Sequence, residues 1–513
     1  MHLFRVDQEL VSNPIADIEG EVWRQLDGLG ISPRGRIAIT AGSRGIANIV
    51  RITKAAGDWV RGRGAEPFLV PCMGSHNGAT AEGQRAMVES LGLTEATTGM
   101  EIRSGMDVVK IGTVASGDVW MDRHCFESDG VLVLNRIKLH TCFSGPVQSG
   151  LTKMMVVGMG KIRSAETFHS APNPQMKDML LEMGALLVGS GKIFAGLAIL
   201  EDGFDRTAEL HAVAAGDILT REPALLARHL DYFPALPCDE LGVLVVGEIG
   251  KTFSGTGMDT NVIGRRGVAG YEDLERPRIR VIAALALSAA SHGNAIGVGL
   301  ADFITRELRE AIDERKTFLN VFTTGEMRRM AIPCTLDDDR EVVEKIRGRF
   351  GDRGWMFIPN TLHLGTLYCT GDVAEGLRNH PSCRVSETPV PIEFEQGKLR
   401  LFSGSDGSAV TAGSAGTGAS AKEADEATPG SAGVPPASSE CGQDARAPGH
   451  FQLSEMRPCF FRSLSAARTT SQATRRIPPP RSRLLRARGS GAPPLPRELR
   501  AVRRWPQGRC RRP

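Results

Sequence analysis

Residues 35–64 read GRIAITAGSRGIANIVRITKAAGDWVRGRG, and this stretch decides the fold. GRIAIT predicts a strand, AGSRG a glycine-bearing turn, and the remainder a helix. The pattern repeats at once, because EPFLVP (66–71) predicts a strand, MGSHNGA a turn and TAEGQRAMVESLG a helix with Thr80 as its N-cap. A third strand, DGVLVLN (129–135), runs into IKLHTCFSG. Strands that alternate with helices predict an α/β fold with a mostly parallel sheet.

A second α/β block begins near ELGVLVVGEIG (240–250). Two more strand–turn–helix units follow it, in which Asp302 and Asp339 are the expected helix caps. The proline-bearing stretch HLDYFPALPCDE (229–240) predicts a linker. We therefore expect an N-terminal α/β domain, a C-terminal α/β domain and a cleft between them, with domain ranges 1–235 and 236–403.

The chain changes character after residue 403. Residues 404–513 begin with a run rich in Gly, Ser and Ala and continue with many prolines and arginines up to RRWPQGRCRRP. Such a segment cannot bury enough apolar surface to fold, so a disordered low-complexity tail is expected. A dispensable read-through or frameshifted gene end and a nucleic-acid-binding arm are both open interpretations of it.

The formal net charge of +3 belongs to the tail rather than to the body. Residues 404–513 hold 18 Lys and Arg against 8 Asp and Glu, which leaves 44 against 51 for residues 1–403, a balance of −7. Phosphate-binding proteins gather Lys and Arg on one face. The mildly acidic body therefore argues against nucleic acid as its main partner.

The ten cysteines are scattered, with no CxxC pair, which is typical of reduced thiols in the cytoplasm. The first twenty residues lack the charged start and apolar core of a signal peptide, and no run approaches the roughly 20 apolar residues of a membrane span. We therefore expect a soluble cytoplasmic protein with no membrane partner. The oligomeric state does not follow from the sequence.

Three polar residues lie just beyond predicted strands. Arg44, His76 and His140 each follow a strand end by a few residues. Because ligands of open α/β sheets bind at the carboxyl ends of the strands, these side chains are expected to share a site. Either imidazole is a candidate general base, and the planar guanidinium suits a carboxylate or phosphate. Structural histidines and a surface arginine are the alternatives.

A lysine and a further histidine lie close behind. Lys153 precedes the apolar run MMVVGMGK, and partial burial of its stem would lower its pKa and make the amine nucleophilic. His169 lies 16 residues further on in SAETFHSAPNP, where its imidazole is a candidate metal ligand. A surface lysine and a solvent-exposed loop histidine remain alternative interpretations.

The second block contains a glycine-rich segment, GEIGKTFSGTGMDTNVIGRR (247–266). It fails the phosphate-loop pattern GxxxxGK[ST], because Val245 stands where that pattern requires glycine, so an NTPase is not expected. Asp259, Asn261, Arg265 and Arg266 are candidates to close over an acidic substrate. An equally good interpretation is that they are turn residues whose charges are solvated.

Four segments in this order resemble the nickel-dependent lactate racemase family. They are GSRGIAN, PCMGSHNGATAEGQ, NRIKLHT with its continuation to His169, and GEIGK.FSGTGMD.N.IGR, and the resemblance covers roughly residues 10–403. It implies a nickel-pincer nucleotide, a pyridinium mononucleotide whose ring carbon and two sulfurs bind nickel. Members of the family act on 2-hydroxy acids.

The resemblance also implies roles for individual residues. Lys153 matches the lysine that can tether the cofactor, with Ser149 and Gly150 in the same cofactor-binding loop. His169 matches the histidine that completes the nickel coordination. His76 and His140 match the paired catalytic histidines, and Arg44 matches the arginine near the substrate.

The implied activity is racemisation or epimerisation of a small 2-hydroxy acid. One histidine removes the hydroxyl proton while the α-hydrogen moves as hydride, and the planar keto acid then takes hydride back on either face. Arg44, Asp259, Asn261 and Arg265 would contact the substrate. Ala41 stands where the family has an aspartate, which implies a different substrate-side pocket.

Two other classes of function remain open. One is a dehydrogenase or metal hydrolase built on the same strand ends, although no GxGxxG follows the first strand. The other is a non-catalytic or differently metallated binding protein that kept the fold.

Overall fold

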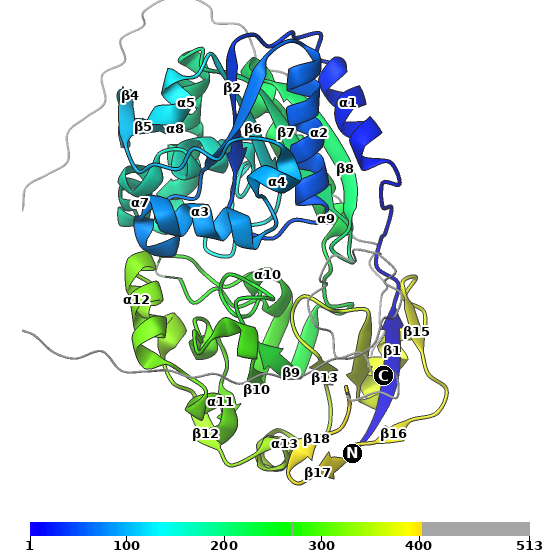
Figure 1. Cartoon of the computed structure of the whole chain (residues 1–513). Helices are drawn as coiled ribbons and strands as arrows, with labels where there is room; N and C mark the ends of the chain where they lie inside the picture. The colour runs from blue at the N-terminus through cyan, green and yellow to red at the C-terminus, as the bar shows by residue number, and fades with distance from the viewer. Residues whose placement is uncertain (269, 403–513) are drawn as a thin grey trace, which may run out of the picture. The chain divides into compact units, whose positions relative to one another are not determined.

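The computed structural model describes residues 1–268 and 270–402 (Figure 1). The tail predicted at 404–513 lies outside the described residues. Two large sheets, one of five strands and one of nine, belong to one compact unit of the chain. The prediction of an α/β fold is confirmed.

The first sheet has the strand order β3-β2-β6-β7-β8. The pairs β3/β2, β2/β6 and β6/β7 are parallel, and β8 is an antiparallel edge strand. The strands are β2 (Arg36–Ala41), β3 (Glu66–Pro71), β6 (Gly130–Arg136), β7 (Ile193–Glu201) and β8 (Thr207–Ala214). A separate antiparallel hairpin is formed by β4 (Val108–Val114) and β5 (Gly117–Asp122).

Helices cover both faces of this sheet, so its strands are buried almost throughout. Ile37 and Ile39 of β2 pack toward the core under α1 and α2, which lie side by side in Figure 1, whereas Ala38 packs into the core under α7 to α9. This alternation follows from the two-residue period of a strand. The helices of this block are α1 (Ile18–Asp27), α2 (Ile49–Gly62), α3 (Ala81–Ser90), α4 (Glu95–Thr98), α5 (Arg123–Glu127), α6 (Leu151–Lys153), α7 (Lys161–Ser170), α8 (Met176–Gly189) and α9 (Ile218–Tyr232).

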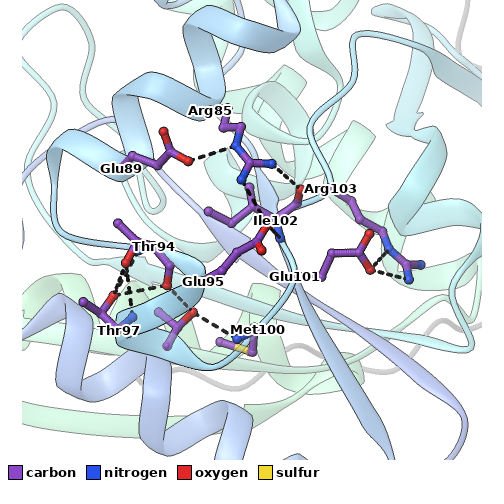
Figure 2. A network of polar contacts seen from close by, with 10 residues as sticks. Arg85, Glu89, Thr94, Glu95, Thr97, Met100, Glu101, Ile102 and Arg103 are labelled. Atoms are coloured by element: carbon purple, nitrogen blue, oxygen red, sulfur yellow. Dashed lines mark hydrogen bonds and ion pairs between the residues drawn. The ribbon is translucent and has the colours of Figure 1, made fainter.

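A polar network holds the segment from Glu95 to Ile102 against helix α3, which precedes it in the chain (Figure 2). Arg85 donates from Nε to Glu89 (2.9 Å), from Nη2 to Glu95 (3.0 Å) and from Nη1 to the carbonyl of Ile102 (3.3 Å). Ile102 in turn forms a parallel bridge with β3. Each half-exposed ion pair contributes little by itself. Together they fix α3 beside the strand that leads to His76.

The second sheet has the order β12-β11-β10-β9-β13-β14-β1-β15, with β16 also paired to β1. Its part from β12 to β13 is parallel, and the pairings from β13 through β14 and β1 to β15 and β16 are antiparallel. The strands are β1 (His2–Gln8), β9 (Glu240–Ile249), β10 (Arg278–Leu287), β11 (Phe303–Thr305), β12 (Cys334–Leu336), β13 (Trp355–Ile358), β14 (Thr366–Cys369), β15 (Cys383–Val385) and β16 (Val390–Pro391).

The helices of the second block also lie on both faces of their sheet. The central strand β9 sends Val243 and Val245 toward α13, and Leu244 and Val246 toward the core that includes α10 and α14. These helices are α10 (Thr260–Ile263), α11 (Arg306–Glu310), α12 (Glu314–Thr324), α13 (Asp339–Phe350) and α14 (Gly371–Leu377). A small hairpin, β17 (Phe394–Glu395) and β18 (Lys398–Leu399), follows.

The first strand of the chain lies in the second sheet. Strand β1 pairs with β14, β15 and β16, and Figure 1 shows it in dark blue among the yellow strands. Residues 2–8 therefore share a core with residues more than 350 positions further on. The domain boundary near residue 235 stays a prediction.

Local capping was predicted with mixed success. Thr80 is confirmed as the N-cap of α3, because its side chain accepts a hydrogen bond from the backbone N–H of Gly83. The expected caps Asp302 and Asp339 are wrong. Thr305 caps α11, and Asp338 caps α13 one residue earlier than expected.

Two findings bear on the environment of the protein. Within residues 1–268 and 270–402, no helix has the length and apolar content that crossing a membrane requires. The seven cysteines of the same residues are free thiols. The cytoplasmic location stays a prediction.

Candidate active site

Three neighbouring loops bring the predicted residues together. Strands β3, β2 and β6 are adjacent and parallel, so the loops that follow them leave the same edge of the sheet. These loops carry His76, Arg44 and His140, respectively. Electrostatic interactions link Arg44 and Lys153 to His76, and Lys153 and His169 to His140. The predicted cluster of Arg44, three histidines and Lys153 therefore exists, although the roles of its members stay predictions.

His140 and Lys153 form the closest contact of the cluster. The Nζ of Lys153 lies 2.6 Å from Nε2 of His140, and the backbone N–H of Cys142 donates to Nδ1 of the same ring at 3.0 Å. A backbone N–H can only donate, so these hydrogen bonds assign the proton of the neutral imidazole to Nε2. Nε2–H then faces Lys153, whose amine accepts this hydrogen bond when it is unprotonated.

The surroundings of Lys153 favour loss of its proton. Burial, followed by the charge of Arg44, lowers the pKa of Lys153 to about 8, although the thiol of Cys142 acts in the opposite direction. Burial, followed by the charge of Lys153, holds the pKa of His140 well below its usual value. The pair therefore consists of a neutral imidazole and an amine that is readily deprotonated. An unprotonated lysine is a nucleophile.

His76 is held by the loop that also carries Arg44. Its Nδ1 is hydrogen bonded to the hydroxyl of Ser43, next to Arg44. Desolvation, followed by the charges of Arg44 and Lys153, lowers the pKa of His76 to about 3. The side chain of His76 also reaches solvent. His76 is a neutral imidazole at neutral pH.

His169 lies in the last turn of α7 and packs through aromatic rings toward His140. The ring centroids of His140 and Phe143 are 4.3 Å apart, those of Phe143 and Phe168 are 6.0 Å apart, and those of Phe168 and His169 are 5.5 Å apart. Burial, followed by the charge of Lys153, lowers the pKa of His169 to about 4. A neutral imidazole can ligate a metal ion.

The second block supplies a cation that sequence reasoning did not assign to the site. Burial, followed by the charge of Arg44, lowers the pKa of Lys251 to about 8, and the charge of Lys251 in turn acts on His76. Arg44, Lys153 and Lys251 all act on His76 as positive charges that lower its pKa. The cluster is therefore electropositive.

The loop that carries His140 is held by side chains of the second block. Asn261 Nδ2 donates to the carbonyl of His140 (3.5 Å), Thr260 Oγ1 donates to that of Thr141 (3.0 Å), and Arg266 Nη2 donates to the hydroxyl of Ser144 (2.7 Å). These contacts fix the backbone on both sides of Cys142. Asn261 is thus a support of His140 in this structure.

Arg329 completes this support, and nothing in the local sequence indicates it. Its guanidinium is 1% exposed and donates to the carbonyls of Thr141 (3.0 Å) and Arg266 (2.7 Å) and to the sulfur of Cys142 (3.0 Å). Burying an arginine is costly unless its donors are paired. Its position therefore couples the second block to the His140 loop.

Two residues predicted to bind substrate have other partners. Asp259 caps α10 through the backbone N–H of Asn261, and its other oxygen lies 3.9 Å from Nζ of Lys138. Arg265 forms an ion pair with Asp302 at 2.8 Å and donates to carbonyls of the second sheet. The structure does not bring Arg265 to the cluster. The next residue, Arg266, reaches the His140 loop instead.

The loop before Lys153 is held by a buried carboxyl group that the sequence did not indicate. Ser149 pairs with Lys138 through its backbone, and Glu222 of α9 accepts hydrogen bonds from the N–H (2.8 Å) and hydroxyl (2.6 Å) of Thr152. A Cβ on Gly150 would lie 2.0 Å from the other oxygen of Glu222, so only glycine fits there. Burial raises the pKa of Glu222 to about 7. Glu222 thereby positions the turn that presents Lys153.

The same face of α9 carries a histidine that makes the fold acid-sensitive. His229 is 6% exposed, and neither ring nitrogen has a hydrogen-bond partner among the described residues. Burial, followed by the charges of Lys138 and Arg136, lowers its pKa to about 3. Between pH 6.5 and 3 the unfolded chain binds a proton that the folded chain does not, so stability falls as the pH falls.

We expect His229→Leu to remove this sensitivity. Between pH 7 and pH 5 the wild-type chain should lose about 2 kcal/mol of unfolding free energy through this residue, and the variant should not. Urea unfolding of both proteins at the two pH values measures the difference. An equal loss in both proteins would contradict the assignment of a neutral buried imidazole.

A surface depression of about 460 Å³ lies away from these groups. It is lined by residues at the amino end of β2 and its neighbours, including Gly35, Ile37, Asp129 and Phe194. The candidate site is at the opposite ends of the same strands. Because ligands of α/β sheets bind at the carboxyl ends, we assign the chemistry to the histidine cluster and not to this depression.

The chain was compared with known proteins by sequence and by structure. No protein-family model and no curated protein sequence matches the chain. The structure is similar to the lactate racemase apoprotein from Thermoanaerobacterium thermosaccharolyticum, with 12% identity, a TM-score of 0.44, and coverage of 69% of this chain and 98% of that chain. A protein from Thermotoga maritima gives the same identity, coverage and TM-score. A likeness of this size does not bear on function.

Proposed function

We propose that the chain racemises or epimerises a small 2-hydroxy acid with the help of a nickel-pincer nucleotide. The observation that carries the proposal is the arrangement of two neutral imidazoles, His76 and His140, around the amine of Lys153 in an electropositive cluster. The resemblance of four sequence segments to nickel-dependent lactate racemases supports the proposal, because three of these segments contribute residues to this cluster.

The residues present fit such a cofactor better than a free metal ion. Residues 1–268 and 270–402 contain no group of three or more His, Cys, Asp or Glu side chains that could hold a metal. When an organic group supplies most of the ligands of a metal, the protein needs to supply only one. His169 is available for this, because its imidazole is neutral and has no hydrogen bond among the described residues. When bound, a nickel-pincer nucleotide supplies a hydride acceptor.

The chain would hold the cofactor through residues of three kinds. His169 would ligate nickel, the amine of Lys153 is the candidate tether, and the backbone around Ser149 and Gly150 would border the nucleotide. The tether is chemically reasonable because burial lowers the pKa of the amine to about 8, so that a fraction of it is unprotonated near neutral pH.

The catalytic work of the chain itself is proton transfer and positioning. Inversion of a stereocentre needs a base on each face of the reacting carbon, and His76 and His140 come from different strands on either side of β2. One of them would accept the hydroxyl proton of the incoming enantiomer, and the other, in its protonated form, would supply the hydroxyl proton of the product. Arg44 would bind the carboxylate and keep the carbon aligned between them.

The low pKa values of the free histidines are themselves an argument for an anionic substrate. The charge of Lys153 depresses the pKa of both His76 and His140, and that of Arg44 depresses the pKa of His76. A bound carboxylate opposes these positive charges and raises both pKa values toward the working pH. Substrate binding would thus restore the basicity that proton transfer requires.

The first test is the nickel content of the full chain made in a host that synthesises the pincer nucleotide. We expect about one nickel per chain for the wild type, and a loss of most of it in His169→Ala. His211→Ala is the matched control, because His211 pairs with Glu209 on β8, and it should retain the metal. No nickel in any of the three proteins would favour a non-catalytic or differently metallated binding protein.

A further inference from the structure

The candidate site contains more cationic side chains than a single carboxylate would pair with. Arg44, Lys153 and Lys251 interact electrostatically with His76, and the amine of Lys153 is already engaged by Nε2 of His140 at 2.6 Å. Two cations, Arg44 and Lys251, therefore remain for a ligand. The following inference rests on the proposed function, because it specifies the substrate of the same site.

Arg44 is free to bind an anion. Among residues 1–268 and 270–402 its guanidinium has no hydrogen bond or ion pair, and its side chain is exposed. The glycine-rich loop of the second block approaches it, since a Cβ on Gly255 would lie 3.7 Å from Nη2 of Arg44. A side chain larger than glycine there would begin to fill the space beside the guanidinium.

Lys251 is held in place by neutral groups only. Its Nζ donates to Oδ1 of Asn320 on α12 at 2.6 Å, and its backbone N–H donates to the hydroxyl of Ser291 at 2.9 Å. An ammonium group has three N–H donors, so two remain for a ligand. Asn320 also accepts from Asn294 (3.2 Å), which fixes the amide that orients the lysine. No carboxylate within the described residues neutralises Lys251.

The charge balance then specifies the ligand. A 2-hydroxy acid with one carboxylate would pair with the exposed Arg44 and leave the partly buried Lys251 without an anionic partner, which is unfavourable. A second acidic group on the substrate removes this cost. We propose that the substrate is a dianionic 2-hydroxy acid, with its α-carboxylate on Arg44 and its second acidic group, a carboxylate or a phosphate, on Lys251.

Calorimetric titration of the cofactor-loaded full chain with racemic malate and racemic lactate tests this proposal. We expect malate to bind at least tenfold more tightly than lactate. Lys251→Met should lower the affinity for malate about tenfold and change that for lactate less than twofold. The matched control is Lys316→Met on α12, whose amine pairs with Asp313, and it should bind both acids as the wild type does.

Asn320→Ala is a second variant, which keeps the charge and removes the group that orients it. It should weaken malate binding about threefold to fivefold, so the proposal does not depend on the folding of one variant. Equal affinity for malate and lactate, or a Lys251→Met variant with wild-type preference, would overturn the proposal. A further control is the binding of nicotinate mononucleotide to the cofactor-free chain. If that binding depends on Lys251 and malate binding does not, Lys251 serves the cofactor phosphate and the proposal is overturned.

The outcomes also separate this inference from the proposed function. Tight malate binding without racemisation would contradict the racemase and leave the dianion site intact. Racemisation of lactate with no preference for malate would support the racemase and remove the dianion site.

Discussion

Replacing Lys161 with methionine is expected to lower the free energy of unfolding by about 3–5 kcal/mol, because it leaves a buried charge without its partner. Lys161 and Asp122 have side chains that are 0% exposed, and Nζ lies 3.3 Å from Oδ2 of Asp122. The same Nζ donates to the carbonyl of Pro71 and to Oε1 of Gln84. Methionine has nearly the same length but satisfies none of these three acceptors.

Loss of the Lys161 ammonium group should also affect the candidate site, because Lys161 lies between two of its segments. Pro71 is the last residue of β3, just before the loop of His76, and Lys161 begins α7, whose last turn carries His169. Gln84 also donates to the carbonyl of Gly74 inside that loop at 2.8 Å. The buried ammonium group thus ties two of the three candidate histidines to one polar network.

Urea unfolding of a double-mutant cycle measures this effect. The variant Lys161→Met with Asp122→Asn should be more stable than Lys161→Met alone, because the orphaned carboxylate is gone. Lys54→Met is the control, since Lys54 pairs with Asp58 on the surface and its loss should cost less than about 1 kcal/mol. A Lys161→Met variant as stable as this control would contradict the network.

Sequence predicts those elements of the fold whose signal lies within a short stretch of consecutive residues. Apolar runs such as GRIAIT, followed by a glycine turn and an amphipathic helix, predicted β2, β3 and β6, and the adjacency of these strands brought Arg44, His76 and His140 together. The pairing of β1 with β14 was not predictable in this way. It depends on cross-strand contacts between residues far apart in sequence, and the strand itself contains no information about its partner.

The missed site residues have the same explanation. Lys251, Glu222 and Arg329 reach the site from other elements, so only tertiary structure shows their contacts. Arg265 and Arg266 illustrate the limit sharply. They are neighbours with identical chemistry in a loop, and one pairs with Asp302 in the second sheet while the other donates to Ser144. Sequence spacing cannot assign a direction to a loop side chain.

The largest effect on activity is expected for the two candidate bases. His140→Gln and His76→Gln should each lower the rate of racemisation by 10² to 10⁴, the usual contribution of a positioned general acid–base group. Glutamine can still donate to Lys153 from position 140, but it cannot take up a proton at neutral pH. Initial rates in both directions, measured with each pure enantiomer, check this result, and His211→Gln is the control that should keep the wild-type rate.

The double variant His76→Gln, His140→Gln decides whether the two imidazoles work as a pair. Each racemisation needs one base to take the hydroxyl proton and the opposite one to return it, so loss of either blocks the same reaction in both directions. The double variant should therefore be no slower than the slower single variant, because residues that act as a unit are not additive. Losses that multiply would mean independent roles, and a wild-type rate in either single variant would remove that histidine from the mechanism. Nickel content should stay unchanged in all three, since His169 is left intact.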